Sequence, residues 1–310
     1  MAGRILVIRG GAIGDFVLTL PAIHLLRDNF PETHLEILGY KHIIALAEDR
    51  FYANATRSIE YAALSSFFVP MGELPPELVA YFGSFQQIVS YLYDPDGFFE
   101  NNVRRCGVKH FLHVPPKLDD SDHATRQLAR PLERLALYLD QPSARLYPSA
   151  ADRDAAAEFL RDARRPVIAL HPGSGSESKN WPLENWIDLG LRLSATATFI
   201  LVAGEADRER ADACRKAWRD LPALLAQDMP LPHLAAVLAE CDLFIGHDTG
   251  ISHIAAAAGT RCVLLFGPTD RDIWAPKNDG VTVIAAENGE LARTTSDMVE
   301  SAVQTALARP

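Results

Sequence analysis

The sequence predicts an α/β protein of two doubly wound domains facing a cleft, and three observations support this fold class. Short strand-like runs alternate with longer segments of helical periodicity along the chain. A parallel pair of strands needs a crossover connection, so this alternation favours parallel sheets covered by helices on both faces. The length of 310 residues exceeds the usual size of one domain. Pro142 and Pro148 mark a linker at 140–148, which predicts domains at 1–147 and 148–310 and leaves open that the last helix packs back on the first domain.

In the first half, strands are predicted where apolar runs are short. They cover residues 4–9, 34–38, 86–92 and 108–114. The spacing of apolar residues predicts a helix over 15–30, in which Pro21 would cause a kink or a late start because proline lacks a backbone donor. A further helix is expected over 122–139, where four leucines fall on one face: Leu128, Leu132, Leu135 and Leu139.

In the second half the alternation restarts. Strands are predicted at 166–171, 198–203, 243–246 and 261–266. Helices are predicted at 151–163, 183–194, 205–218, 231–238, 251–258 and 296–307. Ligands of such sheets bind beyond the carboxyl ends of the strands. We therefore expect functional residues in the loops 10–15, 93–97, 171–179, 204–207, 247–253 and 267–270.

The composition excludes several classes of protein. Hydrophobic residues make up 48% and charged residues 23% of the chain, as in ordinary soluble proteins, and no apolar run approaches the length of a membrane span. A net charge of −10 argues against nucleic acid as a partner and against a general electrostatic hold on an anionic bilayer. No secretory signal is recognisable, and the four cysteines are dispersed, without a metal-ligand spacing. These features predict a cytoplasmic protein with buried thiols and no metal site.

The loop at 9–15, with the sequence RGGAIGD, directly follows the first predicted strand. Its glycines let the backbone approach a ligand closely, and a helix N-terminus favours negative charge. It is neither a dinucleotide fingerprint, since Arg9 stands where the first glycine belongs, nor a phosphate-binding Walker loop. Asp15 has two interpretations, a helix cap or a general base that takes a proton from a hydroxyl.

Two loops of the second half suit a phosphate group. The loop 171–182 combines glycines and serines with Lys179, so that backbone and hydroxyl donors would cradle the phosphate and the lysine would supply charge. Its alternative interpretation is a flexible surface loop with a solvated lysine. The loop 246–253 places Asp248, Thr249 and Gly250 at a helix start. His253 falls in the first turn of that helix, where it either faces a ligand or packs inward.

Taken together and in this order, these loops resemble glycosyltransferase family 9, the ADP-heptose:lipopolysaccharide heptosyltransferases. The resemblance covers nearly the whole chain and is best in three segments: 14–22, 179–186 and 248–270. It implies the GT-B architecture, two Rossmann-like domains with the donor nucleotide held mainly by the second. It also implies an inverting sugar transfer that needs neither a metal nor another cofactor.

The resemblance implies a role for each matched position. Asp15 would be the catalytic base, and Lys179 would neutralise the donor pyrophosphate. Met229 would line the adenine pocket, and Glu205 would meet the ribose, although the register within 204–209 is ambiguous. The donor-binding residues implied by the resemblance are Gly14, Ser174, Lys179, Glu205, Met229, Asp248, Thr249, Gly250 and His253.

The implied partners are a nucleotide-sugar donor, ADP-heptose, and a glycan or glycolipid acceptor of the cell envelope, with peripheral membrane contact where the acceptor is lipid-borne. The first half departs from the family, because it carries YLYDPDG at 91–97 and lacks a dense cationic cluster. The candidate cations are Arg57, Arg104, Arg105 and Lys109. A solvent-exposed charged surface explains them better than a site for a phosphorylated acceptor. The acceptor could therefore be less anionic than the phosphorylated acceptors of the family. Two alternatives remain: a nucleotide-sugar epimerase of similar fold, and a non-catalytic nucleotide-sugar-binding protein.

Overall fold

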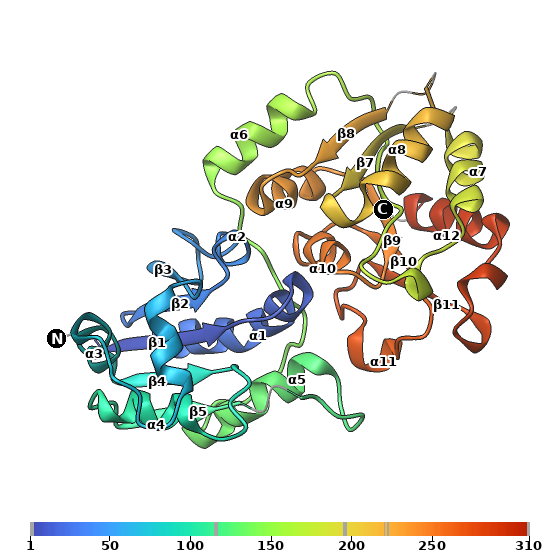
Figure 1. Cartoon of the computed structure of the whole chain (residues 1–310). Coiled ribbons are helices and arrows are strands. Elements are labelled where there is room, and N and C mark those ends of the chain that lie inside the picture. The colour runs from blue at the N-terminus through green and yellow to red at the C-terminus, as the bar shows by residue number, and fades with distance from the viewer. Residues whose placement is uncertain (1–2, 115–116, 195–196, 220, 222, 309–310) are drawn as a thin grey trace. The chain divides into compact units, whose positions relative to one another are not determined.

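The computed structural model describes residues 3–114, 117–194, 197–219, 221 and 223–308 (Figure 1). The chain divides into two compact units, Met1–Pro142 and Ser143–Pro310. The division falls within the proline-containing stretch 140–148. Each unit carries its own parallel sheet with helices on both faces, so the predicted α/β fold class is confirmed.

The first unit contains a five-stranded sheet in the order β3-β2-β1-β4-β5. All neighbouring strands are parallel. The strands are β1 (Arg4–Arg9), β2 (His34–Gly39), β3 (Ala55–Ser58), β4 (Gln87–Ser90) and β5 (His110–His113). Because the order reverses between β1 and β4, a crevice for ligands is expected at the carboxyl ends of these two strands.

The helices of the first unit enclose this sheet. They are α1 (Ile13–Asn29), α2 (Lys41–Ile44), α3 (Pro76–Gly83), α4 (Phe98–Arg105) and α5 (Ala124–Ala129), with the 3₁₀ helices η1 (Ala62–Phe68) and η2 (Arg130–Leu135). Alternate residues of β1 point to opposite faces. Leu6 and Ile8 pack into a core with Phe67, Phe82 and Phe99 from η1, α3 and α4, while α1 lies beside α5.

The second unit contains a six-stranded parallel sheet in the order β11-β10-β9-β6-β7-β8. The strands are β6 (Val167–His171), β7 (Thr198–Ala203), β8 (Ala223–Gln227), β9 (Leu243–His247), β10 (Cys262–Phe266) and β11 (Val281–Ala285). Counted from the first strand of the unit, this is the Rossmann order 3-2-1-4-5-6. The order reverses between β6 and β9.

Helices cover both faces of this second sheet (Figure 1). They are α6 (Ala150–Phe159), α7 (Leu183–Leu193), α8 (Arg208–Ala217), α9 (Leu231–Ala239), α10 (Gly250–Ala257), α11 (Arg271–Trp274) and α12 (Ser296–Ala308), with four 3₁₀ helices: η3 (Glu177–Lys179), η4 (Glu205–Asp207), η5 (Glu287–Gly289) and η6 (Leu291–Arg293). Val299 and Val303 of α12 are buried in one core with α7, α8 and the strands. The last helix therefore packs on α7 and on β9–β11 of its own unit.

Some predicted elements differ from the structure. The edge strands β3, β8 and β11 were not predicted, because their residues are mostly half-buried and give a weaker apolar signal than central strands do, whereas the edge strand β5 lies within its predicted range. The predicted helix over 122–139 is wrong beyond Ala129, since Pro131 lacks an N–H donor and the chain continues as the 3₁₀ helix η2. A late start at Pro21 is also wrong. Helix α1 begins at Ile13, and Pro21 is buried within it.

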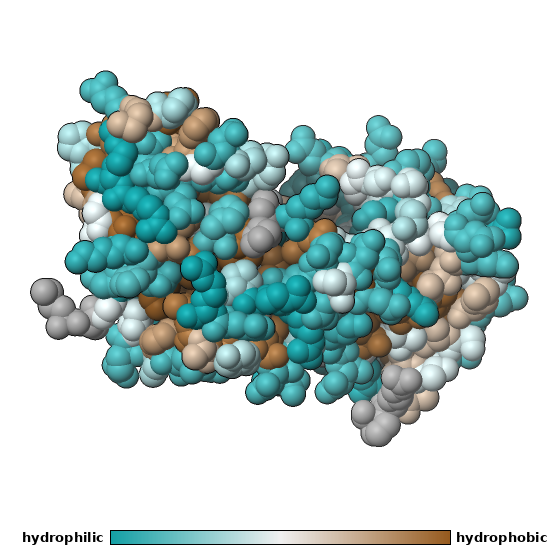
Figure 2. Space-filling model, turned by 90° about the horizontal axis from the view of Figure 1, so that it is seen from below, coloured by the Kyte–Doolittle hydropathy of each residue, from teal (hydrophilic) through white to brown (hydrophobic). Residues whose placement is uncertain are grey.

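Across the described ranges, no helix is long and apolar enough to span a membrane. The face drawn in Figure 2 carries mostly hydrophilic side chains, with hydrophobic ones in small groups.

Candidate functional site

Asp15 is the third residue of α1 and lies at the carboxyl edge of the first sheet. Its Oδ2 accepts a hydrogen bond from the backbone N–H of Ala12 at 2.9 Å, and its Oδ1 lies 3.5 Å from Nη2 of Arg9. Gly11 has a φ of +97°, and a Cβ there would lie 2.6 Å from Oδ2 of Asp15. Asp15 thus performs half of a capping box. The side chain of Asp15 is still 38% exposed, so the carboxylate that caps the helix also remains accessible to a ligand.

Arg9, the last residue of β1, fixes the position of this carboxylate. Its Nε donates to Oγ1 of Thr19 at 2.9 Å and to the carbonyl oxygen of Asp15 at 3.3 Å. The guanidinium lies 5.6 Å from the ring centre of Tyr91. Burial lowers the pKa of Arg9, and the negative charge of Asp15 opposes that effect. Arg9 is a residue of this site that the sequence does not single out. Its signal was an arginine at the end of an otherwise apolar strand.

Asp15 lines a pocket of about 580 Å³ within the first unit. The lining residues follow the carboxyl ends of four neighbouring strands or belong to η1: Arg9, Gly10, Gly11, Asp15, Tyr40, Ile59, Glu60, Phe68, Tyr91, Leu92 and Tyr93. Gly14 precedes Asp15 in α1. Asp94, from the segment 91–97, instead caps α4, where its two oxygens accept from the N–H groups of Phe99 and Glu100 at 3.1 and 2.9 Å.

In the second unit, Lys179 and Asp248 form an ion pair between the loops that follow β6 and β9. Nζ of Lys179 lies 2.6 Å from Oδ2 of Asp248. The carboxylate is largely buried, while the lysine is partly exposed. Nε2 of His253, a buried residue of α10, lies 4.0 Å from Oδ1 of Asp248. The structure therefore brings these three predicted residues together at the point where the strand order reverses.

A buried chain of polar side chains lies beside this ion pair. Oδ2 of Asp207 is 2.5 Å from Nε2 of His171, and both side chains are only 6% exposed. Nδ1 of His171 is 3.3 Å from Oγ1 of Thr249. Thr249 is the N-cap of α10, where its hydroxyl accepts from the N–H of Ser252 at 3.4 Å and Gly250 is the first helical residue. His171, the last residue of β6, has no role assigned from the sequence. Asp207 lies within 204–209, where the resemblance leaves the ribose-contacting acid ambiguous.

Asp207 is buried, unlike the neighbouring acids Glu205 and Glu209. Its Oδ1 accepts the N–H of Gly204 at 2.7 Å. Burial alone would raise the pKa of Asp207, but the hydrogen bond and charge of His171, together with the N–H of Gly204, lower it. Glu205 and Glu209 are exposed. The carboxylate of Asp207 is thus occupied by contacts within the protein, whereas Glu205 remains accessible beyond the carboxyl end of β7.

The loop that carries Lys179 is anchored at both ends. The N–H of Trp181 donates to Nε2 of His247 at 2.8 Å, so the other ring nitrogen carries the proton toward the carbonyl oxygen of Gly173, 3.4 Å away. Burial lowers the pKa of His247 to about 3, which keeps the ring neutral. Arg210 donates to the carbonyl oxygens of Pro172 and Trp181 at 2.8 and 2.5 Å.

The remaining predicted donor-binding residues make fewer contacts. The hydroxyl of Ser174 donates to the carbonyl oxygen of Ser176 at 2.7 Å, within the lysine loop. Met229 is half-buried and follows β8. Within the described ranges, no three His, Cys, Asp or Glu residues are grouped so that they could hold a metal ion.

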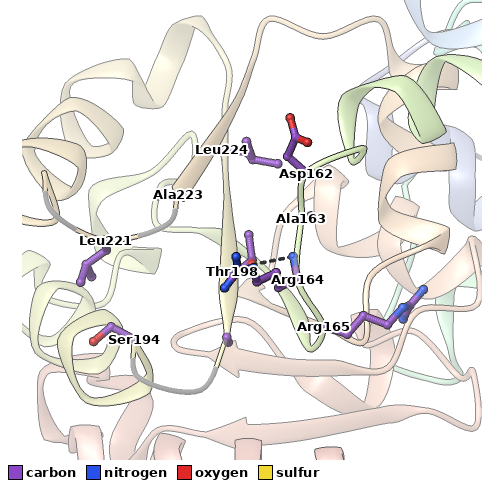
Figure 3. Close-up of a pocket in the computed structure, with 10 residues that line it drawn as sticks. Asp162, Ala163, Arg164, Arg165, Ser194, Thr198, Leu221, Ala223 and Leu224 are labelled. Carbon is purple, nitrogen blue, oxygen red and sulfur yellow. Dashed lines mark hydrogen bonds between the residues drawn. The ribbon is translucent and has the colours of Figure 1, made fainter.

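A second pocket, of about 590 Å³, lies at the opposite edge of the second sheet, at the amino ends of its strands (Figure 3). The N–H of Arg164 donates to Oγ1 of Thr198 there at 3.0 Å. Arg165 is already paired with Asp242 at 2.6 Å. Ligands of doubly wound sheets bind at the carboxyl ends of strands, so we do not assign the site to this pocket.

Sequence comparison relates the chain to enzymes that transfer heptose. Residues 113–302 match the model of glycosyltransferase family 9 (heptosyltransferase). Lipooligosaccharide heptosyltransferase 2 of Haemophilus influenzae is 29% identical over 135 residues, which are 42% of this chain and 39% of that protein. Lipopolysaccharide heptosyltransferase 1 of Pseudomonas aeruginosa is 24% identical over 290 residues, which are 86% of this chain and 79% of that protein. The match thus spans about two fifths of the first relative and most of the second.

Solved structures show the same fold. A glycosyl transferase of family 9 from Veillonella parvula superposes with a TM-score of 0.83 at 17% identity, covering 98% of this chain and 97% of its own. The E. coli ADP-heptose lps heptosyltransferase II superposes with a TM-score of 0.79 at 17% identity, covering 98% of both chains. These similarities confirm the predicted GT-B architecture of two Rossmann-like domains. Since the family model matches more than half of the sequence, the chain belongs to glycosyltransferase family 9.

Proposed function

We propose that this protein transfers a heptose from ADP-heptose to a hydroxyl of a lipopolysaccharide-core or related cell-envelope glycan, with inversion and without a metal ion. The observation that carries the proposal is the partly exposed carboxylate of Asp15, which is oriented by Arg9 in a pocket at the carboxyl edge of the first sheet. The names of the relatives, which are heptosyltransferases of lipopolysaccharide or lipooligosaccharide, support the choice of sugar.

Asp15 is the proposed general base. As the acceptor oxygen attacks the anomeric carbon, its proton passes to the carboxylate and a new carbon–oxygen bond forms. The bond from the anomeric carbon to the phosphate oxygen breaks, and ADP leaves with the electron pair. The contacts to Ala12 and Arg9 hold the carboxylate in one orientation, which is what a base needs for productive geometry.

The second unit is proposed to hold the donor. An ammonium group has three donor hydrogens, so Lys179 can bind Asp248 and the diphosphate together. The backbone N–H groups at the start of α10, with Gly250 as its first residue, favour an anion in the same region. Ser174 and the Asp248–Thr249 segment are assigned to the phosphates and the sugar, Glu205 to the ribose and Met229 to the adenine, with His253 behind Asp248 and Gly14 beside the base.

The proposal is tested first at Asp15. In Asp15→Asn, the amide oxygen can still accept from the N–H of Ala12, but the group no longer takes a proton. We expect transfer from ADP-heptose to fall by about 10²- to 10⁴-fold, with unchanged binding of ADP in calorimetry. Asp94→Asn is the matched control, because Asp94 is a helix cap at the same edge that does not line the pocket. Near-normal turnover by Asp15→Asn would reject the assignment of the base.

The donor site is tested at Lys179. Lys179→Ala should weaken ADP binding by about tenfold or more, as expected when a charged hydrogen bond to phosphate is lost. Unchanged affinity would reject this role. Mass spectrometry of the products separates the proposed transfer from the two alternatives: an epimerase would return an isomerised donor without acceptor, and a binding protein would return the donor unaltered.

A further inference from the structure

The pocket beside Asp15 offers little positive charge to a ligand. Among the described residues that line it, Arg9 is the only lysine or arginine. Arg9 is 9% exposed and is already engaged with Thr19 and Asp15. Glu60 adds a second carboxylate to the lining. The wall therefore presents two carboxylates against one buried and paired cation.

Three of the four candidate cations of the first unit bind elsewhere, and the fourth, Lys109, does not line the pocket. Arg57 stacks on the ring of Tyr81, 4.2 Å from its centre. Arg104 is bound to Oε1 of Glu100 at 2.7 Å, and Arg105 donates to a neighbouring carbonyl oxygen and amide oxygen at 2.9 and 2.7 Å. None of these three lines the pocket. A phosphate placed there would face carboxylates and find no free arginine fork.

Four of the eight remaining lining residues are aromatic. Tyr93 is 73% exposed, Phe68 41% and Tyr40 37%, although all three line the pocket. Tyr91 is buried, and its hydroxyl donates to the carbonyl oxygen of Leu128 at 3.2 Å. Large rings exposed together at a pocket contribute little to the core and mark ligand-binding surfaces. The face of an aromatic ring attracts the positively polarised C–H groups of a sugar ring.

We propose that the acceptor ring bound in this pocket is an uncharged sugar, bearing neither phosphate nor carboxylate, which stacks on Tyr93 and Phe68 and donates hydroxyl hydrogen bonds to Glu60 and Asp15. This inference rests on the proposed function, because it takes the pocket to be the acceptor site. It names the substrate class from charge and shape: stacking rings and carboxylates suit hydroxyl-rich neutral rings, and each carboxylate repels an anionic substituent.

The experiment compares two acceptor probes made from one preparation. The first is deacylated lipopolysaccharide core oligosaccharide with its phosphates, and the second is the same material after removal of phosphate with hydrofluoric acid. Saturation-transfer NMR measures binding, and transfer of labelled heptose from ADP-heptose measures turnover. We expect the dephosphorylated probe to bind and to react with at least tenfold higher kcat/KM.

Variants tie the preference to the pocket. Tyr93→Ala should raise KM for the dephosphorylated probe about tenfold with little change in kcat, and Tyr93→Trp should restore the KM. Tyr138→Ala is the control, because Tyr138 is an exposed aromatic residue of the same unit that does not line the pocket. Glu60→Lys should shift the preference toward the phosphorylated probe.

The outcomes separate the two proposals. Preferred binding and transfer to the phosphorylated probe would overturn the inference and leave the heptosyltransferase function standing. Binding of the dephosphorylated probe that is lost in Tyr93→Ala, without transfer to any probe, would support a sugar-binding role of the pocket and overturn its assignment as the acceptor site together with the function. Binding of neither probe would overturn the inference, and calorimetry with ADP would then report separately on the donor site.

Discussion

Asp207 accepts hydrogen bonds with both carboxylate oxygens, and its replacement by asparagine tests the buried polar network of the second unit. Oδ1 accepts from Gly204 and Oδ2 faces Nε2 of His171, at 2.7 and 2.5 Å. An asparagine has one acceptor and one donor group there. It either leaves the N–H of Gly204 unsatisfied or forces His171 to carry its proton on Nδ1, toward Thr249.

The cost follows from burial, since both side chains of the pair are 6% exposed. We expect Asp207→Asn to lower the free energy of unfolding by about 2–4 kcal/mol, between the cost of one buried unsatisfied group and that of a broken buried ion pair. For a unit of this size the shift in Tm is about 2–4 °C per kcal/mol, so about 4–16 °C in all. All four tryptophans lie in the second unit, so tryptophan fluorescence reports its unfolding alone.

The matched control is Asp228→Asn. Asp228 pairs with Arg208 at 2.6 Å, but the two side chains are 46% and 49% exposed. Exposed pairs contribute about 0–1 kcal/mol, so the control should shift Tm by less than about 4 °C. Equal shifts for the two variants would refute the reasoning that burial sets the cost of losing the carboxylate.

Gly173→Ala should destabilise the second unit by about 1–3 kcal/mol, because its Cβ would overlap that of Asp207, whereas Gly175→Ala meets no atom within 4 Å and should be neutral in the fluorescence assay. Acid should destabilise this unit, because burial lowers the pKa of His247 from 6.5 to about 3 and the unfolded chain therefore takes up the proton first. Urea titrations should show the free energy of unfolding fall by up to about 1.4 kcal/mol per pH unit below about pH 6.5. A free energy of unfolding that stays constant down to about pH 4 would contradict this. The pKa of Asp207 is also lowered, so its contribution is lost only below its unfolded value of about 3.8. Cys106 is half-buried, while the other three thiols are buried and have pKa values raised by burial. A disulfide reagent should therefore label at most one thiol in the native protein and all four in denaturant.

Much of the fold could be predicted because its signals are local. The strands β1 and β7 match their predicted bounds, since each is a continuous apolar run closed by a turn. The edge strands β3, β8 and β11 lacked that signal. Their pairing is decided by the neighbouring strand, which supplies the hydrogen bonds that a half-buried segment needs.

The candidate site divides in the same way. Asp15 and Lys179 could be singled out because each sits in a loop whose glycines, serines or prolines follow a predicted strand. Arg9, His171 and Asp207 could not, because their roles depend on partners that lie elsewhere in the chain. His171 meets Asp207 and Thr249 only because β6 lies between β7 and β9 in the sheet.

The two parallel sheets, the family resemblance and the loops in which chemistry is expected follow from the amino-acid sequence, because periodicity, turns and motifs are read from adjacent residues. Which loops meet, and which charges remain available to a ligand, depends on the packing of the chain. The order of the strands brings together segments that are far apart in the chain. A charged side chain is paired only when folding places its partner within contact distance. For this reason Arg57 and Arg104 of the first unit are engaged with Tyr81 and Glu100, and the wall beside Asp15 combines aromatic rings with two carboxylates.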